Sequence, residues 1–250
     1  MIRLGMENPK VLKTCMSAVA SLVEEAAFIA SPDGLKLRTM DATHTVLLDL
    51  DLPACAFSRF EVEKQTTIGV KLAEISKVLS RAKPNDGLLI EFDEQAGHMA
   101  ISLSGPPQRR FNVPVIEAES VSYPDPKIAF PATAEVQAGI LQDGVKDAEL
   151  VRASPVKIEI AESGLRMWAD GANGSSELRL ETASKALANL KVASPTQAGY
   201  SPERLGGILS VCAPNDTVGI SLGTDMPIQV DCSVGSSKLR FLLAPIVEAA

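Results

Sequence analysis

The sequence predicts an α+β fold of two similar domains, each with two helices packed on antiparallel strands. Three pairs of segments recur at one offset of 130 residues: Gly34-Leu35-Lys36 with Gly164-Leu165-Arg166, Pro84-Asn85-Asp86 with Pro214-Asn215-Asp216, and Arg110-Phe111 with Arg240-Phe241. Helical and strand-like apolar spacings also follow one another in the same order in both halves. The period is far longer than the roughly 20–50 residues of solenoid repeats, so the duplicated unit is a whole domain.

The first half begins with a weakly alternating segment, residues 1–6, which predicts a strand. Asn8-Pro9 then opens an amphipathic helix over 9–22, and Ser31-Pro32-Asp33-Gly34 predicts a turn. The other elements expected in this half are strands at 26–30, 35–40, 45–52, 88–93, 98–103 and 110–116, and a second amphipathic helix at 72–82.

The second half repeats this order, and residues 117–131 separate the two halves. The expected elements are helices at 136–145 and 202–212 and strands at 156–161, 165–169, 177–182, 218–222, 228–232 and 238–243. The segment 117–131 holds prolines at 124, 126 and 131, which favours an extended connector. The predicted limits are therefore 1–116 for the first domain, 117–131 for the connector and 132–250 for the second domain.

Composition excludes several classes of function. The net charge of −7 argues against a protein that holds nucleic acid by a dominant basic surface, and 4% aromatic residues give little support to base-stacking platforms. The four cysteines, at 15, 55, 212 and 232, form no C-x-x-C, so we expect buried free thiols in a reducing cytosol and no metal site. The chain shows neither a signal-peptide pattern at its start nor a run of about 18 apolar residues, which favours a soluble intracellular protein.

Three segments carry a family resemblance. They are Leu37-Arg38-Thr39-Met40-Asp41-Ala42-Thr43-His44, then Gly69-Val70-Lys71-Leu72 leading into Ser76-Lys77-Val78-Leu79, and the ending Leu242-Leu243-Ala244-Pro245-Ile246-Val247-Glu248. Together, in this order and at this spacing, they resemble the corresponding parts of PCNA sliding clamps. The resemblance covers the whole chain, the duplication and the connector included, and the short acidic sequence suggests an archaeal version.

The resemblance implies the DNA-clamp fold and a concrete function. Three chains would form a ring of six domains, with sheets outside and four helices per chain lining a hole that holds duplex DNA without sequence preference. DNA polymerase, clamp loader, ligase and flap endonuclease would dock short peptides under the connector. Such a protein is not an enzyme, needs no cofactor and would work in the cytoplasm with the nucleoid. The sequence leaves open whether the three chains are identical or a mixture of related ones.

Helix charges provide a first check on this implication. The segments 9–22 and 72–83 each carry +2, whereas 135–148 carries −2 and 201–212 is neutral, so the helices are relatively basic on an acidic body. An encircling protein needs only loose phosphate contacts. The residues expected to face DNA are Lys10, Lys13, Lys77, Arg81, Lys83, Lys146 and Arg204. These cations could equally be the solvated faces of amphipathic helices.

The family positions also predict a peptide groove and a subunit contact. The groove residues are Met40, His44, Leu47, Ile128, Phe130, Pro227, Ala244, Pro245 and Ile246. The strands 109–116 and 174–182 would pair between subunits through Arg109, Arg110, Phe111, Val113, Glu177, Leu178, Arg179 and Leu180. Met40 and Leu47 could instead be plain core residues, and both strands could be edges protected by their own charges.

Two other functions compete with the clamp. A two-domain hydrolase could use Asp41 and Asp170, which end corresponding strands, as paired carboxylates, although aspartates are also common in turns. Asp49 and Asp51 share one strand face and could hold a metal, although a solvated edge explains them as well. His44 and His98 lie in no nucleophile or metal motif. The second alternative is a clamp-like scaffold that binds partners without encircling DNA.

Overall fold

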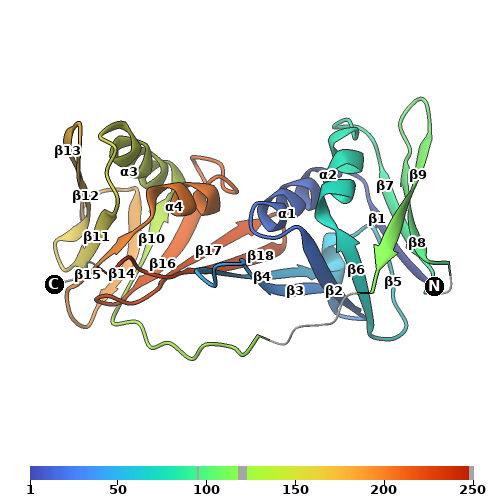
Figure 1. Ribbon diagram of the computed structural model, residues 1–250, viewed down its shortest axis with the longest axis horizontal. Coiled ribbons are helices and arrows are strands. Elements are labelled where there is room, and N and C mark those ends of the chain that lie inside the picture. Colours follow the sequence, from blue (N-terminus) through green and yellow to red (C-terminus); the bar gives the residue numbers. More distant parts are fainter. Residues whose placement is uncertain (95, 118–122, 248–250) are drawn as a thin grey trace. The chain divides into compact units, whose positions relative to one another are not determined.

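The computed structural model describes residues 1–94, 96–117 and 123–247 (Figure 1). The chain divides into two compact units that are discontinuous in sequence. Unit 1 comprises residues 1–44, 48–123 and 233–239, and unit 2 comprises 45–47, 124–232 and 240–250. The continuous domain limits 1–116, 117–131 and 132–250 stay a prediction, and the part of the connector at 118–122 lies outside the described residues, as does Glu248 of the tail.

Unit 1 contains two helices and most of the strands of the first repeat. Its elements are β1 (Ile2–Met6), α1 (Lys10–Ala20), β2 (Glu25–Ser31), β3 (Gly34–Met40), β4 (Val46–Pro53), the 3-10 turn η1 (Ala54–Ala56), β5 (Arg59–Glu61), β6 (Thr66–Lys71), α2 (Leu72–Ser80), β7 (Leu88–Phe92), β8 (His98–Leu103) and β9 (Arg109–Ile116). The strands follow the order β4-β3-β2-β6-β9-β8-β7-β1-β5. The pairs β1–β5, β1–β7, β2–β3, β2–β6, β6–β9, β7–β8 and β8–β9 are antiparallel.

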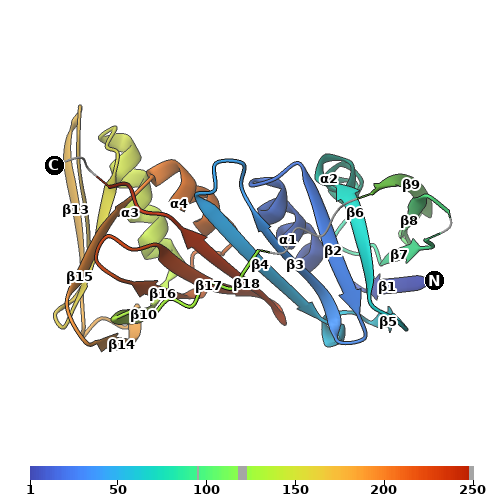
Figure 2. The same cartoon turned by 60° about the horizontal axis from the view of Figure 1, so that its bottom comes forward.

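The two helices of unit 1 cover one face of its strands. In Figure 1 both α1 and α2 lie on the same side of β2, β3 and β6, and Figure 2 shows these strands side by side in front of the helices. The helix α2 buries Leu72, Ile75 and Leu79 against the sheet. Each such side chain contributes about 1.5–3 kcal/mol when it leaves water. Burial of one apolar stripe leaves the opposite faces of α1 and α2 in solvent.

Unit 2 repeats the same succession of elements. They are β10 (Ala132–Gln137), α3 (Ala138–Leu150), β11 (Val156–Ala161), β12 (Gly164–Gly171), β13 (Gly174–Glu181), β14 (Leu187–Val192), β15 (Thr196–Tyr200), α4 (Pro202–Leu209), β16 (Thr217–Leu222), β17 (Ile228–Val234) and β18 (Ser237–Leu243). One series of strands runs β14-β10-β16-β17-β18, and a separate four-stranded sheet runs β13-β12-β11-β15. This order matches that of unit 1 strand for strand, which confirms the predicted α+β arrangement of two similar units with two helices each.

The repeated glycines have a steric explanation. Gly34 and Gly164 open equivalent strands and adopt φ angles of +154° and +134°. A Cβ at Gly34 would collide with the carbonyl oxygen of Leu52, and one at Gly164 with that of Leu180. Only glycine allows this close approach of two backbones, so one steric requirement accounts for glycine at both positions.

Several predicted boundaries are wrong, because local periodicity does not identify tertiary partners. Val136 was expected to begin a helix but lies in β10, where it is paired with Val218 of β16. The helix α3 begins two residues later and continues to Leu150. The helices α2 and α4 end at Ser80 and Leu209, earlier than expected. The strands β5, β6, β10, β14 and β15 were not predicted from spacing.

The four cysteines differ in their exposure to solvent. Cys15, Cys212 and Cys232 are buried free thiols, as expected, but Cys55 in η1 is exposed. Burial raises the pKa of Cys15 to about 12, so this thiol stays protonated at neutral pH. A hydrogen bond with the Cys232 thiol lowers the pKa of Cys212. The expectation of four buried thiols is therefore wrong at Cys55.

Candidate functional site

The exposed cations of unit 1 lie on α1, on α2 and on the segment after α2. Lys10 and Lys13 are exposed on α1, and Lys77 is exposed on α2 with its Nζ 3.1 Å from Oε1 of Glu74. Because α2 ends at Ser80, Arg81 is its C-cap residue and Lys83 lies in the following loop. Arg81 therefore lies at the end of the helix predicted over 72–82 and not inside it, and the side chains of Arg81 and Lys83 are both exposed.

Arg109, expected at a subunit contact, is bound within its own unit. Its Nη1 donates to the carbonyl oxygen of Arg81 at 2.8 Å, and its Nη2 pairs with Oδ2 of Asp86. Asp86 is 2% exposed, and the same Oδ2 accepts a hydrogen bond from the backbone N–H of Lys83 at 2.9 Å. The pair therefore joins β9 to the end of α2. The repeated Pro-Asn-Asp turn marks Asp86 in the sequence, but nothing local marks its arginine partner.

The helices of unit 2 carry a different charge pattern. Lys146 on α3 is exposed, and its Nζ lies 3.4 Å from Oδ1 of Asp143. Asp147 and Glu149 follow on the same helix, so α3 is acidic overall. Arg204 on α4 is half-buried, and its backbone N–H donates to the capping hydroxyl of Ser201. The basic character that the sequence indicated is thus concentrated on α1 and α2.

Strand β13 presents one free edge in the described part of the chain. It is paired with β12 over its whole length and ends the four-stranded sheet. Leu178 and Leu180 are half-buried, whereas Glu177 and Arg179 are exposed on the other face. Hydrogen bonds from Arg179 and then Arg166 hold the pKa of Glu177 below its ordinary value. An extended edge with accessible leucines can accept another strand.

Strand β9 has a shorter free edge than the sequence suggested. On one side it is paired with β8 from Arg109 to Pro114. On the other side Val115 and Ile116 are paired with β6, which leaves 109–114 as the part available to a further strand. Phe111 is half-buried there, and Val113 is buried at 4% exposure. The free edge therefore covers only the first six of the eight residues predicted for the subunit contact.

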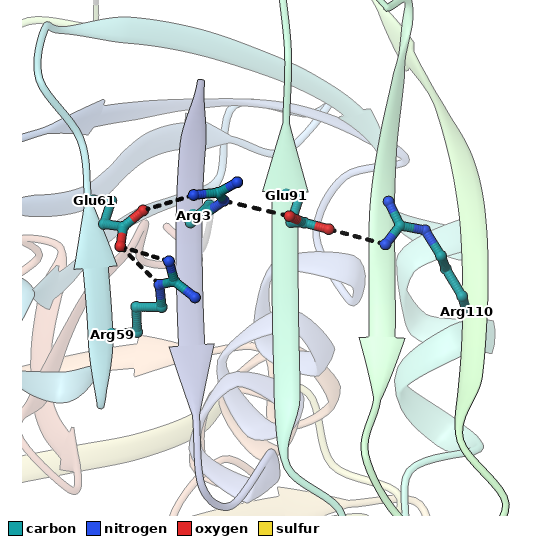
Figure 3. A network of polar contacts seen from close by, with 5 residues as sticks. All are labelled: Arg3, Arg59, Glu61, Glu91 and Arg110. Carbon is teal, nitrogen blue, oxygen red and sulfur yellow. Dashed lines mark hydrogen bonds and ion pairs between the residues drawn. The ribbon is translucent and has the colours of Figure 1, made fainter.

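A row of ion pairs crosses the strands next to this edge (Figure 3). Arg110 on β9 is joined to Glu91 on β7 at 3.0 Å, and Glu91 is joined to Arg3 on β1 at 3.4 Å. The row continues through Glu61 of β5 to Arg59. It links strands that are far apart in sequence, so Arg110 already has an acidic partner within its own sheet.

The predicted groove residues of unit 1 lie at the end of β3, where Met40 is the last strand residue, and on the following turn, which carries His44. Met40 is half-buried and His44 is exposed, with a φ of 56°. The backbone N–H of His44 donates to the carbonyl oxygen of Asp41 at 2.9 Å, and Thr43 donates to the buried carboxylate of Asp41. Asp41 therefore stabilises the turn that presents His44, which explains its position without catalysis.

The remaining groove residues belong to unit 2. Leu47 is buried at 5% exposure, and Ile128, Phe130, Pro227, Ala244 and Pro245 are half-buried. Residues 244–246 follow β18 as a hydrogen-bonded segment: the N–H of Ala244 donates to Thr45 O and that of Ile246 to Gly199 O, each at 2.8 Å. Ile246 is 37% exposed. The tail thus presents an apolar side chain from a fixed backbone.

The two carboxylates considered for metal binding, Asp49 and Asp51, are engaged in ion pairs. Asp49 is paired with Arg38, and Asp51 lies 3.9 Å from Nζ of Lys36. Among the described residues there is no group of three or more His, Cys, Asp or Glu side chains placed to hold a metal ion. No helix in the described ranges is long and apolar enough to cross a membrane.

Comparison with known proteins identifies relatives along the full chain. The model of the N-terminal domain of proliferating cell nuclear antigen matches residues 1–120. The chain is 33% identical over 250 residues to the DNA polymerase sliding clamp of Thermofilum pendens, which covers 99% of this chain and 100% of that protein. It is 33% identical over 243 residues to the DNA polymerase sliding clamp of Pyrococcus furiosus, with 97% of both chains covered.

Solved structures agree with the sequence relatives. A crystal structure of PCNA from Thermococcus kodakaraensis has a TM-score of 0.93 at 25% identity and covers 98% of this chain and 100% of that one. A structure of the C-terminal region of FEN-1 bound to A. fulgidus PCNA has a TM-score of 0.90 at 21% identity over 100% of both chains, and shows the shared fold. The resemblance drawn from the sequence motifs is confirmed. The chain belongs to the PCNA family of DNA polymerase sliding clamps, which are processivity factors of DNA replication and not enzymes.

Proposed function

We propose that three copies of this chain, or of this chain and close relatives, form a closed ring around duplex DNA. The free edge of β13, with Leu178 and Leu180 accessible, is the observation that carries this proposal. Its partner would be the free edge at 109–114 of the next chain, where Phe111 is half-buried. Leu150 at the end of α3 is 75% exposed and would also leave water in such a contact. Pairing between subunits would cover two free strand edges that could otherwise associate with unrelated chains.

The exposed cations of α1 and α2 would face the DNA. Lys10, Lys13 and Lys77 project from the solvated side of two helices whose other side is buried. Loose contacts of this kind attract phosphate without fixing a position, which suits a ring that must slide. Lys146 and Arg204 would contribute less, because one lies beside Asp143 and the other is half-buried.

The ring would hold its enzymes through short peptides. The predicted groove residues include the exposed His44, the half-buried Ile128 and Phe130, and the 37% exposed Ile246. The relative from A. fulgidus, solved with the C-terminal region of FEN-1, supports flap endonuclease as one partner. DNA polymerase, clamp loader and ligase are the others. The protein would then act in the cytoplasm, where the nucleoid lies.

One charge-reversal experiment tests the proposal. A Lys77→Glu, Arg81→Glu variant changes the charge by −4 per chain on exposed side chains, while Lys185→Glu, Lys191→Glu makes the same change on exposed residues outside the helices. We expect both variants to form trimers by light scattering. Only the first should lose polymerase processivity on primed circular DNA, with partial recovery at high salt because screening shortens the repulsion.

The outcomes separate the competing functions. A wild-type chain that stays monomeric at tens of micromolar would exclude a ring of identical copies and leave only a mixed one. The Lys77→Glu, Arg81→Glu variant could form trimers and still give full processivity at every salt concentration. That result would show that Lys77 and Arg81 are ordinary solvated cations that do not face DNA. Trimers that bind partner peptides but never stay on circular DNA would support the scaffold that does not encircle DNA.

A further inference from the structure

Two arginines of the sheets reach the connector, where the described residues 123–131 form neither helix nor strand. In unit 1, Nη1 of Arg38 donates to the carbonyl oxygen of Tyr123 at 3.3 Å. In unit 2, Nη2 of Arg240 donates to Oδ1 of Asp125 at 2.7 Å. We refer to these two contacts as the connector clasps. Neither arginine is among the predicted DNA-facing, groove or subunit-contact residues.

The first clasp is held in place by a carboxylate. Asp49 binds Arg38 through two parallel contacts, Nε with Oδ1 and Nη2 with Oδ2 at 3.1 Å. Both side chains are largely removed from solvent, at 28% and 19% exposure. A two-pronged pair fixes the plane of the guanidinium, and the third nitrogen, Nη1, is then directed at Tyr123. A lysine could not make all three contacts in this geometry.

The second clasp is more open to solvent. Arg240 and Asp125 are 32% and 56% exposed, so salt should weaken their attraction. Farther along, the N–H of Ala193 donates to the carbonyl oxygen of Pro131 at 2.8 Å. The connector is thus bound at 123, 125 and 131. The two apolar connector residues assigned to the peptide groove, Ile128 and Phe130, lie between the last two of these points.

We propose that Arg38 and Arg240 are positioning residues for partner binding: they hold the connector so that Ile128 and Phe130 are presented before a peptide arrives. This inference rests on the proposed peptide groove. A connector that is already ordered loses less conformational freedom when a peptide docks, which strengthens binding without any new contact to the peptide. The clasps themselves need not touch the peptide.

The Asp125→Asn variant tests the second clasp with little risk to the fold, because this side chain is more than half exposed. Two measurements are made on the full chain. Tryptic cleavage after the exposed Lys127 reports connector order, and titration with a short peptide bearing a glutamine and aromatic anchors reports affinity. We expect cleavage to become several-fold faster and affinity to fall about 2–5-fold at low salt. Both differences should shrink at high salt.

Two further variants complete the design. Asp51→Asn removes a carboxylate that is 47% exposed and lies near Lys36 of the neighbouring strand instead of the connector, so cleavage and affinity should stay at wild-type values. Arg38→Lys keeps the charge but loses the planar fork, so it should also accelerate cleavage after Lys127 and weaken the peptide. Near-identical circular dichroism spectra would establish that both variants are folded.

The results distinguish this inference from the proposed groove. If the wild-type chain binds no such peptide, the proposed groove fails, and an unchanged cleavage rate in Asp125→Asn would then reject the clasp as well. If the wild type binds but Asp125→Asn leaves cleavage and affinity unchanged, the clasp does not position the connector. Faster cleavage at unchanged affinity would show that connector order does not matter for docking, which also overturns the inference.

Discussion

At the scale of single residues, two aspartates at equivalent repeat positions share one contact and differ in another. Oδ2 of Asp86 caps the backbone N–H of Lys83, and Oδ2 of Asp216 caps that of Ala213 in the same way, at 2.7 Å. Asp86 is buried and also binds Arg109, whereas Asp216 is exposed. The capping role is therefore common to both repeats, and the ion pair belongs to the first repeat alone.

This difference predicts unequal costs of truncation. Asp86→Ala removes the cap and leaves the guanidinium of Arg109 without its buried partner, which should cost about 3 kcal/mol of unfolding free energy. Asp216→Ala removes only an exposed cap and should cost about 1 kcal/mol. Urea denaturation of both variants at one protein concentration measures the two values. Equal losses would mean that the Arg109 pair adds nothing to stability.

The same two positions show how far residue-level prediction extends. The capping role follows from the Pro-Asn-Asp turn itself, because aspartate side chains commonly bind backbone N–H groups nearby. The partner Arg109 lies 23 residues away and could not be deduced from local pattern. Similarly, the exposure of Lys13 and Lys77 follows from helical spacing, but the contact from Arg38 to Tyr123 depends on the tertiary fold.

At the scale of elements, the helix α4 packs against α3, and two adjacent glycines of α4 have unlike surroundings. A Cβ on Gly206 would lie 3.2 Å from Cγ1 of Val145 on α3, which is tighter than ordinary contact. A Cβ on Gly207 would meet no atom within 4 Å. Neighbouring positions of one helix thus differ in whether a methyl group can be added.

Alanine substitutions on α4 should reveal this difference. Gly207→Ala should raise the unfolding free energy by about 0.5–1 kcal/mol, because alanine loses less backbone entropy in a helix. Gly206→Ala gains the same entropy but must displace Val145, so its net effect should be smaller or destabilising. Thermal melts followed by circular dichroism compare the two. A larger gain for Gly206→Ala would contradict the packing described for this interface.

Prediction of elements from the sequence succeeded where one face of an element is long and regular. The helix α1 and the strands β8 and β11 were identified by their periodicity. The strands β10, β14 and β15 were not, because five or six residues of mixed character match several patterns. Val136 is the clearest failure: its separation from Val145 suits a helix, but pairing with Val218 makes it a strand residue.

At the scale of the whole molecule, paired carboxylates occur on both repeats. Three glutamates have pKa values below the ordinary value, and in each the largest cause is a side-chain hydrogen bond. The donor is Arg59 for Glu61, Lys64 for Glu94 and Arg179 for Glu177. These groups are exposed, so each contributes little by itself. Because all three pKa values are lowered on folding, the stability of the folded chain nevertheless depends on pH.

The sign of this dependence is fixed by the lowered pKa values. A carboxylate whose pKa is lower when folded stabilises the fold above its unfolded pKa, and this stabilisation is lost as pH falls through the folded pKa. We therefore expect the urea midpoint to fall as pH is taken below about 4, near the ordinary pKa of glutamate. The fall should be smaller in 1 M salt, where the screening length is about 3 Å. A midpoint that rises on acidification would contradict these assignments.

The ion-pair row of Figure 3 also bears on the ancestry of the chain. Arg110 and Arg240 are equivalent repeat positions, and so are Arg3 with Thr133 and Glu91 with Ser221. The two copies were identical when the gene doubled. The charged row is therefore retained in one half or was acquired there, while the other half has uncharged residues across the same two strands. The segment between the halves supplies Asp125 to Arg240. An arginine present in both copies thus binds a carboxylate of its own sheet in one copy and a carboxylate of the connector in the other.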